Sequence, residues 1–251
     1  MTPEARASTQ RQNGQKASVR WCKAESLLTD IQELLLPCET VLDVGCGINP
    51  QEYLRPVVHI CCEPFHQYVE RLQQIVSART DRIYVVMEAS WDEVVRIFPP
   101  SSVDTVFLVD VVEHLEKEEG RRLLSQTEHI ARRQLVVFTP LGYMPQHHSD
   151  GKDAWGLDGA AWQEHRSGWL PEEFDESWQV LACNDFHSAD NMGRRLEKPF
   201  GAFWAARTRP ESAEQIQGPV AAHKEVERAR ARRIGAHLLI ESLTRRFAVK
   251  R

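Results

Sequence analysis

The sequence predicts an α/β protein: a three-layer sandwich around a seven-stranded, mostly parallel sheet that ends in an antiparallel strand pair. Three observations predict this class. Apolar runs of strand length alternate with helical stretches from residue 40 to residue 138. These runs are apolar on both sides, as in a parallel sheet that helices cover on both faces. The last two runs follow one another without a convincing helix between them, which favours an antiparallel pair.

Each predicted element follows from a local pattern. Ala24–Leu36 carries its leucines and its isoleucine on a helical repeat, which predicts an amphipathic helix. The apolar runs predict strands at Thr40–Val44, Val57–Cys62, Arg82–Met87, Val103–Val109, Gln134–Phe138, Trp178–Asn184 and Ala202–Arg207. The stretches between them predict helices at Gln51–Leu54, Gln67–Ala78, Trp91–Phe98 and Val111–Arg132.

Three stretches lie outside this alternation. Residues 1–20 are polar, so we expect them to be disordered or loosely attached to a domain at 21–208. Residues 140–174 are long and irregular, which is typical of a lid or substrate loop, and their tryptophans would pack it onto the domain. Residues 209–251 are basic and carry one apolar stripe, which predicts a helical extension that packs on the domain or on a second copy in a homodimer.

The composition is that of a water-soluble globular protein, with 42% hydrophobic residues, 27% charged residues and a net charge of −5. No run reaches the roughly 20 apolar residues of a membrane span. The first 20 residues lack the apolar core of a signal peptide. The six cysteines form no Cys-x-x-Cys pair, so we expect free thiols. Together these features predict a cytoplasmic protein without a membrane span.

A glycine turn follows the first predicted strand, in the stretch Val41-Leu-Asp-Val-Gly-Cys-Gly-Ile-Asn-Pro50. Gly45 and Gly47 let the backbone approach a ligand closely, because no Cβ stands in the way. Asn49 suits a helix N-cap and Pro50 the first position of a helix. Ligands of open parallel sheets bind at such turns, beyond the carboxyl ends of the strands. We therefore expect a cofactor here.

Three residues narrow the choice of cofactor. A dinucleotide-binding turn would have a third glycine where this chain has Pro50. Asp43, directly before the turn, suits a cation better than a diphosphate, which favours the sulfonium and ammonium groups of S-adenosylmethionine. Glu63 ends the second predicted strand, about 18 residues after Gly45, and can accept both ribose hydroxyls.

With these residues the chain resembles the class I, Rossmann-like, S-adenosylmethionine-dependent methyltransferases. The matching pieces are Val41–Gly47, Glu63 and Val103–Leu115, which ends in Glu-His-Leu. The resemblance covers about residues 38 to 207 and implies S-adenosylmethionine as cofactor and S-adenosylhomocysteine as product. The residues that it would bring to the cofactor are Asp43, Gly45, Cys46, Gly47, Glu63, Pro64, Ala89, Ser90, Asp110 and Val111.

A methyltransferase that acts on a hydroxyl also needs a group that removes a proton. The chain offers several histidines and one acid around the predicted cofactor cleft and the long loop. These candidates for catalysis are His165, His148, His147, Asp150 and His114. The His-His-x-Asp grouping at 147–150 lacks a third well-placed ligand, so we expect no metal site.

The leading interpretation is methylation of an oxygen on a small molecule or a saccharide. His165-Arg-Ser-Gly-Trp-Leu-Pro-Glu-Glu-Phe174 is similar to methyltransferases of bacterial glycan clusters, which implies a glycan acceptor. Asp110-Val-Val-Glu113 departs from the Asn/Asp-Pro-Pro-aromatic sequence of base N-methyltransferases, which argues against a nucleic-acid partner. Two alternatives remain: an inactive regulatory protein that binds S-adenosylmethionine, and an NAD-dependent oxidoreductase.

Overall fold

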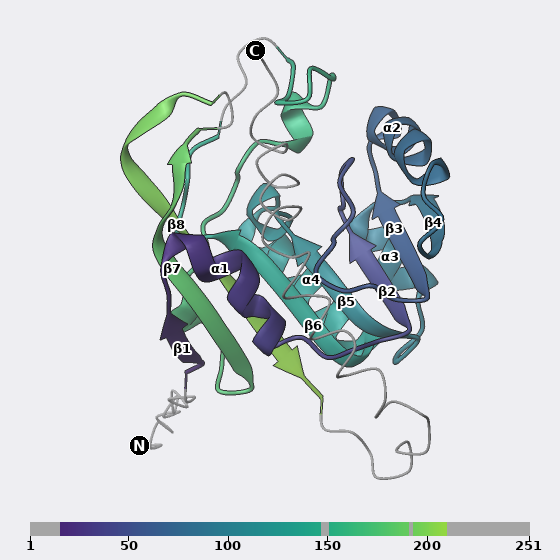
Figure 1. The fold of residues 1–251 in the computed structure, drawn as a ribbon, viewed down its shortest axis with the longest axis horizontal. Helices are drawn as coiled ribbons and strands as arrows, with labels where there is room; N and C mark the ends of the chain where they lie inside the picture. Colours follow the sequence, from purple (N-terminus) through teal and green to yellow (C-terminus); the bar gives the residue numbers. More distant parts are fainter. Residues whose placement is uncertain (1–15, 147–150, 191–192, 210–251) are drawn as a thin grey trace, which may run out of the picture.

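The computed structural model describes residues 16–146, 151–190 and 193–209 (Figure 1). Within them, an eight-stranded sheet has the strand order β1-β7-β8-β6-β5-β2-β3-β4. The strands are β1 (Ser18–Trp21), β2 (Thr40–Val44), β3 (Val58–Glu63), β4 (Ile83–Glu88), β5 (Val103–Val109), β6 (Ala131–Pro140), β7 (Trp178–Ala189) and β8 (Arg195–Thr208). β8 runs antiparallel to β6 and to β7, and the other neighbours are parallel. The predicted α/β class and its closing antiparallel pair are confirmed, with one additional edge strand.

The strand order reverses between β2 and β5. From β2 the chain adds β3 and β4 towards one edge of the sheet, then returns to place β5 and β6 on the other side of β2. β2 and β5 pair directly, with Asp43 opposite Phe107. The chain leaves the carboxyl ends of β2 and β5 in opposite directions. The crevice between these two connections is where doubly wound folds bind their ligands. The glycine turn after β2 therefore lies at the place where a ligand is expected.

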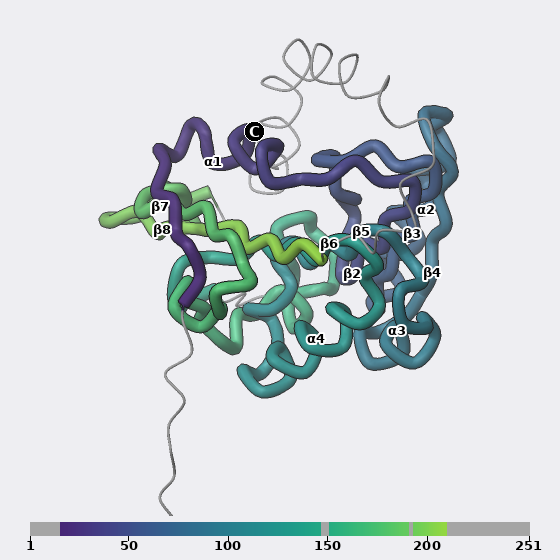
Figure 2. Tube along the Cα trace, turned by 90° about the horizontal axis from the view of Figure 1, so that it is seen from below, coloured from purple at the N-terminus to yellow at the C-terminus, as the bar shows by residue number. Residues whose placement is uncertain are grey.

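Helices cover both faces of the sheet, with α1 and α2 on one side and α3 and α4 on the other (Figure 2). They are α1 (Ala24–Asp30), α2 (His66–Ser77), α3 (Trp91–Ile97) and α4 (Lys117–Ile130). β5 is buried along its whole length because it is covered twice. Leu108 packs in one core cluster with Leu123 of α4, whereas Phe107 packs in another with Leu27 of α1.

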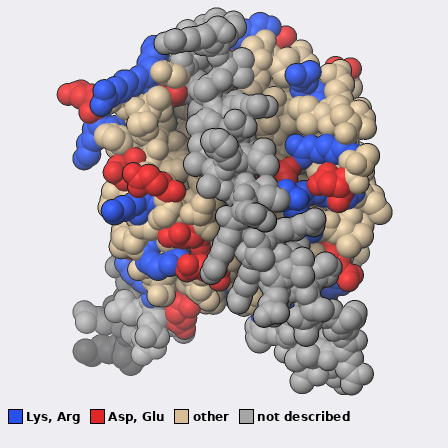
Figure 3. All heavy atoms as spheres, viewed as in Figure 1, with Lys and Arg blue, Asp and Glu red and all other residues tan. Residues whose placement is uncertain are grey.

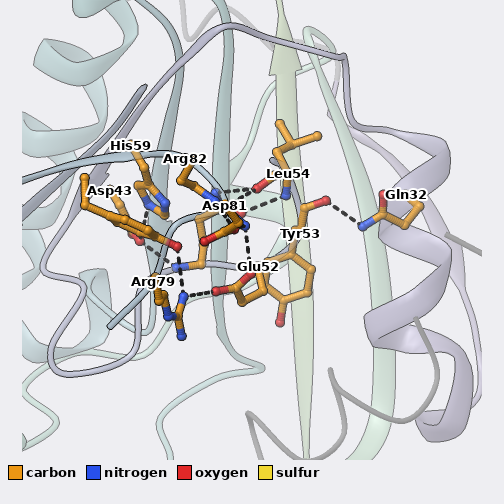
Figure 4. Close-up of polar contacts among 11 residues, drawn as sticks. Gln32, Asp43, Glu52, Tyr53, Leu54, His59, Arg79, Asp81 and Arg82 are labelled. Carbon is orange, nitrogen blue, oxygen red and sulfur yellow. Dashed lines mark hydrogen bonds and ion pairs between the residues drawn. The ribbon is translucent and has the colours of Figure 1, made fainter. Parts of the chain in front are cut away.

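The prediction of a helix at Gln51–Leu54 is wrong. This segment is irregular, and no helix begins at Asn49 or Pro50. Its conformation is held by side chains from distant parts of the chain (Figure 4). Glu52 forms ion pairs with Arg79 and with Arg82, the latter at 3.1 Å. These tertiary contacts outweigh the local signal for a helix N-terminus.

The aromatic ring of Tyr53 anchors the same segment in the core. It lies edge-on against Trp204, with ring centroids 4.6 Å apart, and it is 6% exposed. Gln32, in the 3₁₀ turn after α1, donates a hydrogen bond to the main-chain oxygen of Tyr53 at 2.9 Å (Figure 4). The segment after the glycine turn is thus tied to α1 and to β8, which restricts the conformations that the turn can adopt.

The chain ends differ in part from the expectation. Residues 16–20, expected to be loosely attached, belong to the fold, because Ser18–Trp21 pairs in parallel with β7 at the edge of the sheet. Residues 1–15 and the expected basic extension from 210 onward lie outside the described residues. All six cysteines are free thiols, as expected, and four of them are buried.

The described parts of the segment after β6, residues 141–146 and 151–177, contain two 3₁₀ turns, Ala160–Trp162 and Pro171–Glu173. Trp169 fixes it to the domain and is 2% exposed. Its indole nitrogen donates to the main-chain oxygen of Val112 at 3.2 Å, and the ammonium of Lys117 lies 3.6 Å from its ring centroid. The prediction that a tryptophan would pack this segment onto the domain is confirmed for Trp169.

Gly120 in α4 makes room for that ring. A Cβ at this position would lie 2.5 Å from Cζ2 of Trp169. We expect Gly120→Val to lower the free energy of unfolding by about 2–3 kcal/mol, because the added atoms overpack a rigid buried contact. Urea unfolding measures this, with Ser125→Val on the exposed side of α4 as the matched control. Equal stability of the two variants would contradict this packing.

Candidate functional site

The turn after β2 has the backbone that the two glycines predict. Gly45 has φ +68° and Gly47 has φ +57°, a left-handed conformation that side chains with a Cβ rarely adopt. A Cβ on Gly45 would lie 3.0 Å from Val111, which follows β5. A Cβ on Gly47 would lie 2.9 Å from the ring of Trp155. The turn is therefore packed closely from both sides, and glycine is required at each position.

Glu63, at the end of β3, lies directly beside this turn and is 4% exposed. Its Oε2 accepts a hydrogen bond from the main-chain nitrogen of Gly47 at 2.9 Å, and its Oε1 accepts one from Phe65 at 3.0 Å. These contacts orient the carboxylate beside the turn. Pro64, which stands between Glu63 and Phe65 in the chain, is half-buried.

Asp43 lies beneath the turn, away from the pocket. Its Oδ2 accepts a hydrogen bond from the main-chain nitrogen of Gln51 at 2.7 Å and lies 3.2 Å from Nε2 of His59 (Figure 4). Burial lowers the pKa of His59, but hydrogen bonds with Asp43 and Cys61 outweigh it and raise this pKa to about 9. Asp43 and His59 thus form a buried ion pair at neutral pH, and Asp43 supports the turn from beneath.

The remaining residues predicted for the cofactor divide into two groups. Asp110 directly follows β5, has φ +52° and lines the pocket; such a strained backbone is common at functional sites. Cys46 points into the core, where the Cys61 thiol and burial raise its pKa, so only its backbone faces the turn. Ala89 is buried and Ser90 caps α3, and neither lines the pocket.

A pocket opens at the carboxyl ends of β2 and β5. The glycine turn and Asp110 form one side of it, and the segment after β6 forms the other. The residues that line it are Gly45, Gly47, Asp110, Glu113, His114, Pro140, Met144, Gln146, Ala154, Trp155, Gln163, His165 and His187. The pocket is thus rich in histidine and amide side chains, which can bind a polar molecule.

Two of the predicted catalytic histidines meet in this pocket. His114 and His165 have ring centroids 4.9 Å apart, at an interplanar angle of 63°. His147, His148 and Asp150 lie outside the described residues. The structure therefore brings together one candidate from the turn after β5 and one from the long segment after β6.

Four residues with acid, amide or imidazole side chains also line the pocket and were not predicted. Glu113 precedes His114 and is 2% exposed, and Gln146 and Gln163 come from the long segment. His187 comes from β7, and burial, with a smaller contribution from His165, lowers its pKa to about 4. His187 is therefore neutral at pH 7. Only Glu113 had a signal in the sequence, because it belongs to the Glu-His-Leu motif.

Trp155 covers the glycine turn from outside. Its ring lies edge-on against Tyr68 of α2, with centroids 4.9 Å apart. The hydroxyl of Tyr68 donates to Asp153 at 2.5 Å, and Asp153 in turn accepts from the main-chain nitrogen of Trp155 at 2.8 Å. These contacts attach the segment around Trp155 to α2. The ring of Trp155 therefore covers Gly47.

The face of the molecule shown in Figure 3 carries a mixture of charges. On its described part, acidic and basic side chains are interspersed, without a broad area of one sign. No helix of the described residues is long and apolar enough to cross a membrane.

No family model matches the chain, and no curated protein matches it. Among solved structures, the chain is similar to a SAM-dependent methyltransferase from Archaeoglobus fulgidus, with 14% identity, a TM-score of 0.47, and 74% of this chain and 92% of that chain covered. It is also similar to a cyclopropane synthase from Mycobacterium tuberculosis, with 20% identity, a TM-score of 0.36, and 48% and 41% covered. A magnesium protoporphyrin IX methyltransferase from Synechocystis with bound SAM matches at 16% identity and a TM-score of 0.41, with 73% and 77% covered. The chain thus spans less than half the length of the cyclopropane synthase, and at this level of likeness we draw no conclusion about activity.

Proposed function

We propose that this protein is an S-adenosylmethionine-dependent methyltransferase that transfers the methyl group to an oxygen of a small polar molecule or a saccharide. The observation that carries the proposal is the joint position of the glycine turn, Asp110 and two histidines around one pocket at the point where the strand order reverses. One side of this pocket suits a nucleoside cofactor, and the other suits an acceptor with hydroxyl groups.

The residues beside the turn fit S-adenosylmethionine. Gly45 and Gly47 present backbone without a Cβ, and the Glu63 carboxylate, held beside the turn by the main-chain nitrogen of Gly47, suits the ribose hydroxyls. Asp110 supplies a carboxylate on the side where the ammonium of the methionine part would lie. The ring of Trp155 rests on Gly47, so entry of a nucleoside requires this ring to swing aside or to stack on the base.

The structure gives an additional argument against NAD. A diphosphate is usually held by main-chain N–H groups at the N-terminus of a helix. The stretch from Cys46 to Val57 contains no helix, so the glycine turn is not followed by the helix N-terminus that would present such N–H groups. A cofactor that carries a sulfonium and an ammonium in place of phosphates does not need one.

When bound, S-adenosylmethionine supplies an activated methyl group, so the protein has to align the acceptor and help remove its proton. Nδ1 of His165 faces the main-chain oxygen of Met144 at 2.6 Å, which places the proton on Nδ1 and the lone pair on Nε2. His114 makes the same kind of contact through Nδ1 with the main-chain oxygen of Glu164, at 3.1 Å. Both rings therefore offer Nε2 to activate the acceptor oxygen. Gln146 and Gln163 lie beside them and suit its other hydroxyls.

Calorimetry on the full chain with S-adenosylhomocysteine and with NAD tests the cofactor. We expect one S-adenosylhomocysteine to bind per chain and NAD not to bind. Asp110→Asn keeps a residue that tolerates positive φ, and it should weaken this binding by removing a charge. Binding of NAD instead would contradict the proposal and support the oxidoreductase.

Transfer of a labelled methyl group to a panel of saccharides and small hydroxyl compounds tests the reaction. We expect His165→Ala to reduce turnover by roughly 100-fold or more and to leave the affinity for S-adenosylhomocysteine unchanged. His129→Ala, on the outer side of α4, is the matched control. Binding of S-adenosylhomocysteine without transfer to any acceptor would contradict the enzyme and support the regulatory alternative.

A further inference from the structure

Three side chains that line the pocket come together from two separate parts of the chain. Glu113 and His114 belong to the 3₁₀ turn after β5, and His165 comes from the long segment after β6. One ligand atom of each, a carboxylate oxygen or a ring nitrogen, lies within 4.8 Å of the other two. Ligands around one metal ion at about 2.1 Å lie roughly 3–4 Å apart, so small side-chain rotations would bring these three atoms to a common centre.

The hydrogen bonds of the two histidines prepare both rings for a metal. A carbonyl oxygen only accepts, so Nδ1 of each ring must carry the proton that it shares with Glu164 or Met144. When the ring is neutral, Nε2 then holds the lone pair. Histidines that bind metals are usually oriented in this way, by donating the other ring N–H to a main-chain oxygen or a carboxylate.

The carboxylate of Glu113 is held in the same manner. Oγ1 of Thr139 donates to its Oε2 at 3.0 Å. The main-chain oxygen of Glu113 accepts hydrogen bonds from Arg166 at 2.7 Å and from Ser167 at 3.0 Å, the residues that follow His165. These bonds join the 3₁₀ turn to the long segment, and they fix the distance between the carboxylate and the His165 ring.

Two of the three side chains in this grouping are buried. Glu113 is 2% and His165 is 6% exposed. A carboxylate in such a place needs a positive charge or several donors to offset its lost hydration. A divalent cation would supply such a positive charge, and Nε2 of each neutral ring would be a ligand for it.

We propose that Glu113, His114 and His165 bind one divalent first-row transition metal ion. Two imidazoles and one carboxylate on the same side of an ion leave open coordination positions, which is typical of catalytic sites. Because the grouping lines the pocket, those positions face the space where the acceptor is proposed to bind. This differs from the sequence expectation of no metal, because the third ligand, His165, lies far along the chain from Glu113 and His114.

The role of the ion rests on the proposed function, although its binding does not. An acceptor hydroxyl on the ion has a lowered pKa and loses its proton to solvent. The resulting oxygen anion forms the new bond to the methyl carbon as the bond from that carbon to sulfur breaks, and sulfur keeps the electron pair as a thioether. The acceptor leaves as a methyl ether and the cofactor as S-adenosylhomocysteine.

Titration of the metal-free full chain with Co²⁺ tests the site, because visible absorption reports both binding and the coordination of the ion. We expect one Co²⁺ per chain. Glu113→Gln and His165→Ala should each weaken binding by at least about 100-fold, and Thr139→Val by about 10-fold, through loss of a bond that orients a ligand. The matched control is His66→Ala, since His66 lies near Glu70 and Glu88 on the exposed side of α2. Circular dichroism identifies any variant that fails to fold.

The outcomes separate this inference from the proposed function. Co²⁺ affinity that is unchanged in both Glu113→Gln and His165→Ala would overturn the metal site. Full methyl transfer in metal-free protein with excess chelator would overturn the role of the ion, and the proposed function would stand with the histidines acting directly. One Co²⁺ bound at the grouping in a chain that binds no S-adenosylhomocysteine would support the metal site and contradict the methyltransferase.

Discussion

Replacing His59 with leucine is expected to lower the free energy of unfolding by about 3–5 kcal/mol, because it leaves the carboxylate of Asp43 charged and buried without its partner. Both side chains are at most 1% exposed, so water cannot offset the loss. Asp43 also accepts the main-chain N–H of Gln51, so the conformation of the glycine turn should suffer as well. Urea unfolding at pH 7 measures the change.

The pH dependence of this effect gives a second measurement. The pKa of His59 is about 9 in the folded chain and about 6.5 in the unfolded chain. The pair therefore contributes its full stability below about pH 6.5, and this contribution is lost as the pH rises through about 9. The stability difference between the wild type and His59→Leu should shrink between pH 6.5 and pH 9.5 by about 3 kcal/mol. A difference that does not change with pH would show that His59 is neutral in the fold.

His66→Leu is the matched control for this substitution. His66 also lies beside carboxylates, with Nδ1 2.8 Å from Glu88, but both side chains are well exposed. Solvent screens such a pair, so we expect almost no change in stability. A loss in His66→Leu as large as that in His59→Leu would mean that burial is not the cause.

Replacing Trp169 with alanine is the other change with a large expected effect. The ring is 2% exposed and lies among Gly120, Lys117 and the backbone of Val112. Loss of so large a buried ring should cost about 3–5 kcal/mol. It should also lower turnover, because the main-chain oxygen of Trp169 accepts from Gly142 at 2.7 Å and so helps hold the pocket wall that carries His165.

Trp162→Ala is the control, because Trp162 lies in the same segment and is 47% exposed. Thermal unfolding and methyl transfer, measured on both variants, separate the two roles of Trp169. If Trp169→Ala were as stable and as active as Trp162→Ala, the long segment would be held by contacts other than this ring.

Local patterns predicted most of the sheet correctly. The runs at Thr40–Val44 and Val103–Val109 match β2 and β5 residue for residue. Both are buried central strands, so nearly every position is apolar and both ends are marked by a change in composition. β7 and β8 continue beyond their expected ends, to Ala189 and from Arg195, because their outer parts are more exposed and lack an apolar signal.

What the local patterns missed at the glycine turn has a common physical cause. The signal for a helix at Asn49 and Pro50 was local, whereas the ion pairs of Glu52 and the burial of Tyr53 depend on residues from other elements. The contact of Asp43 with His59, on the neighbouring strand, likewise depends on another element. A single sequence does not show which charged residues become neighbours across a sheet.

The sequence by itself determined the α/β class, the glycine turn and the acid at the end of β3, because strand patterns and positive φ angles are encoded by nearby residues. It also indicated His114 and His165 as separate candidates. Only the tertiary structure decided that these two rings meet beside Glu113, and that Asp43 supports the turn from beneath. Both facts depend on how segments far apart in the chain return to the same end of the sheet, and that return is set by packing across the whole domain.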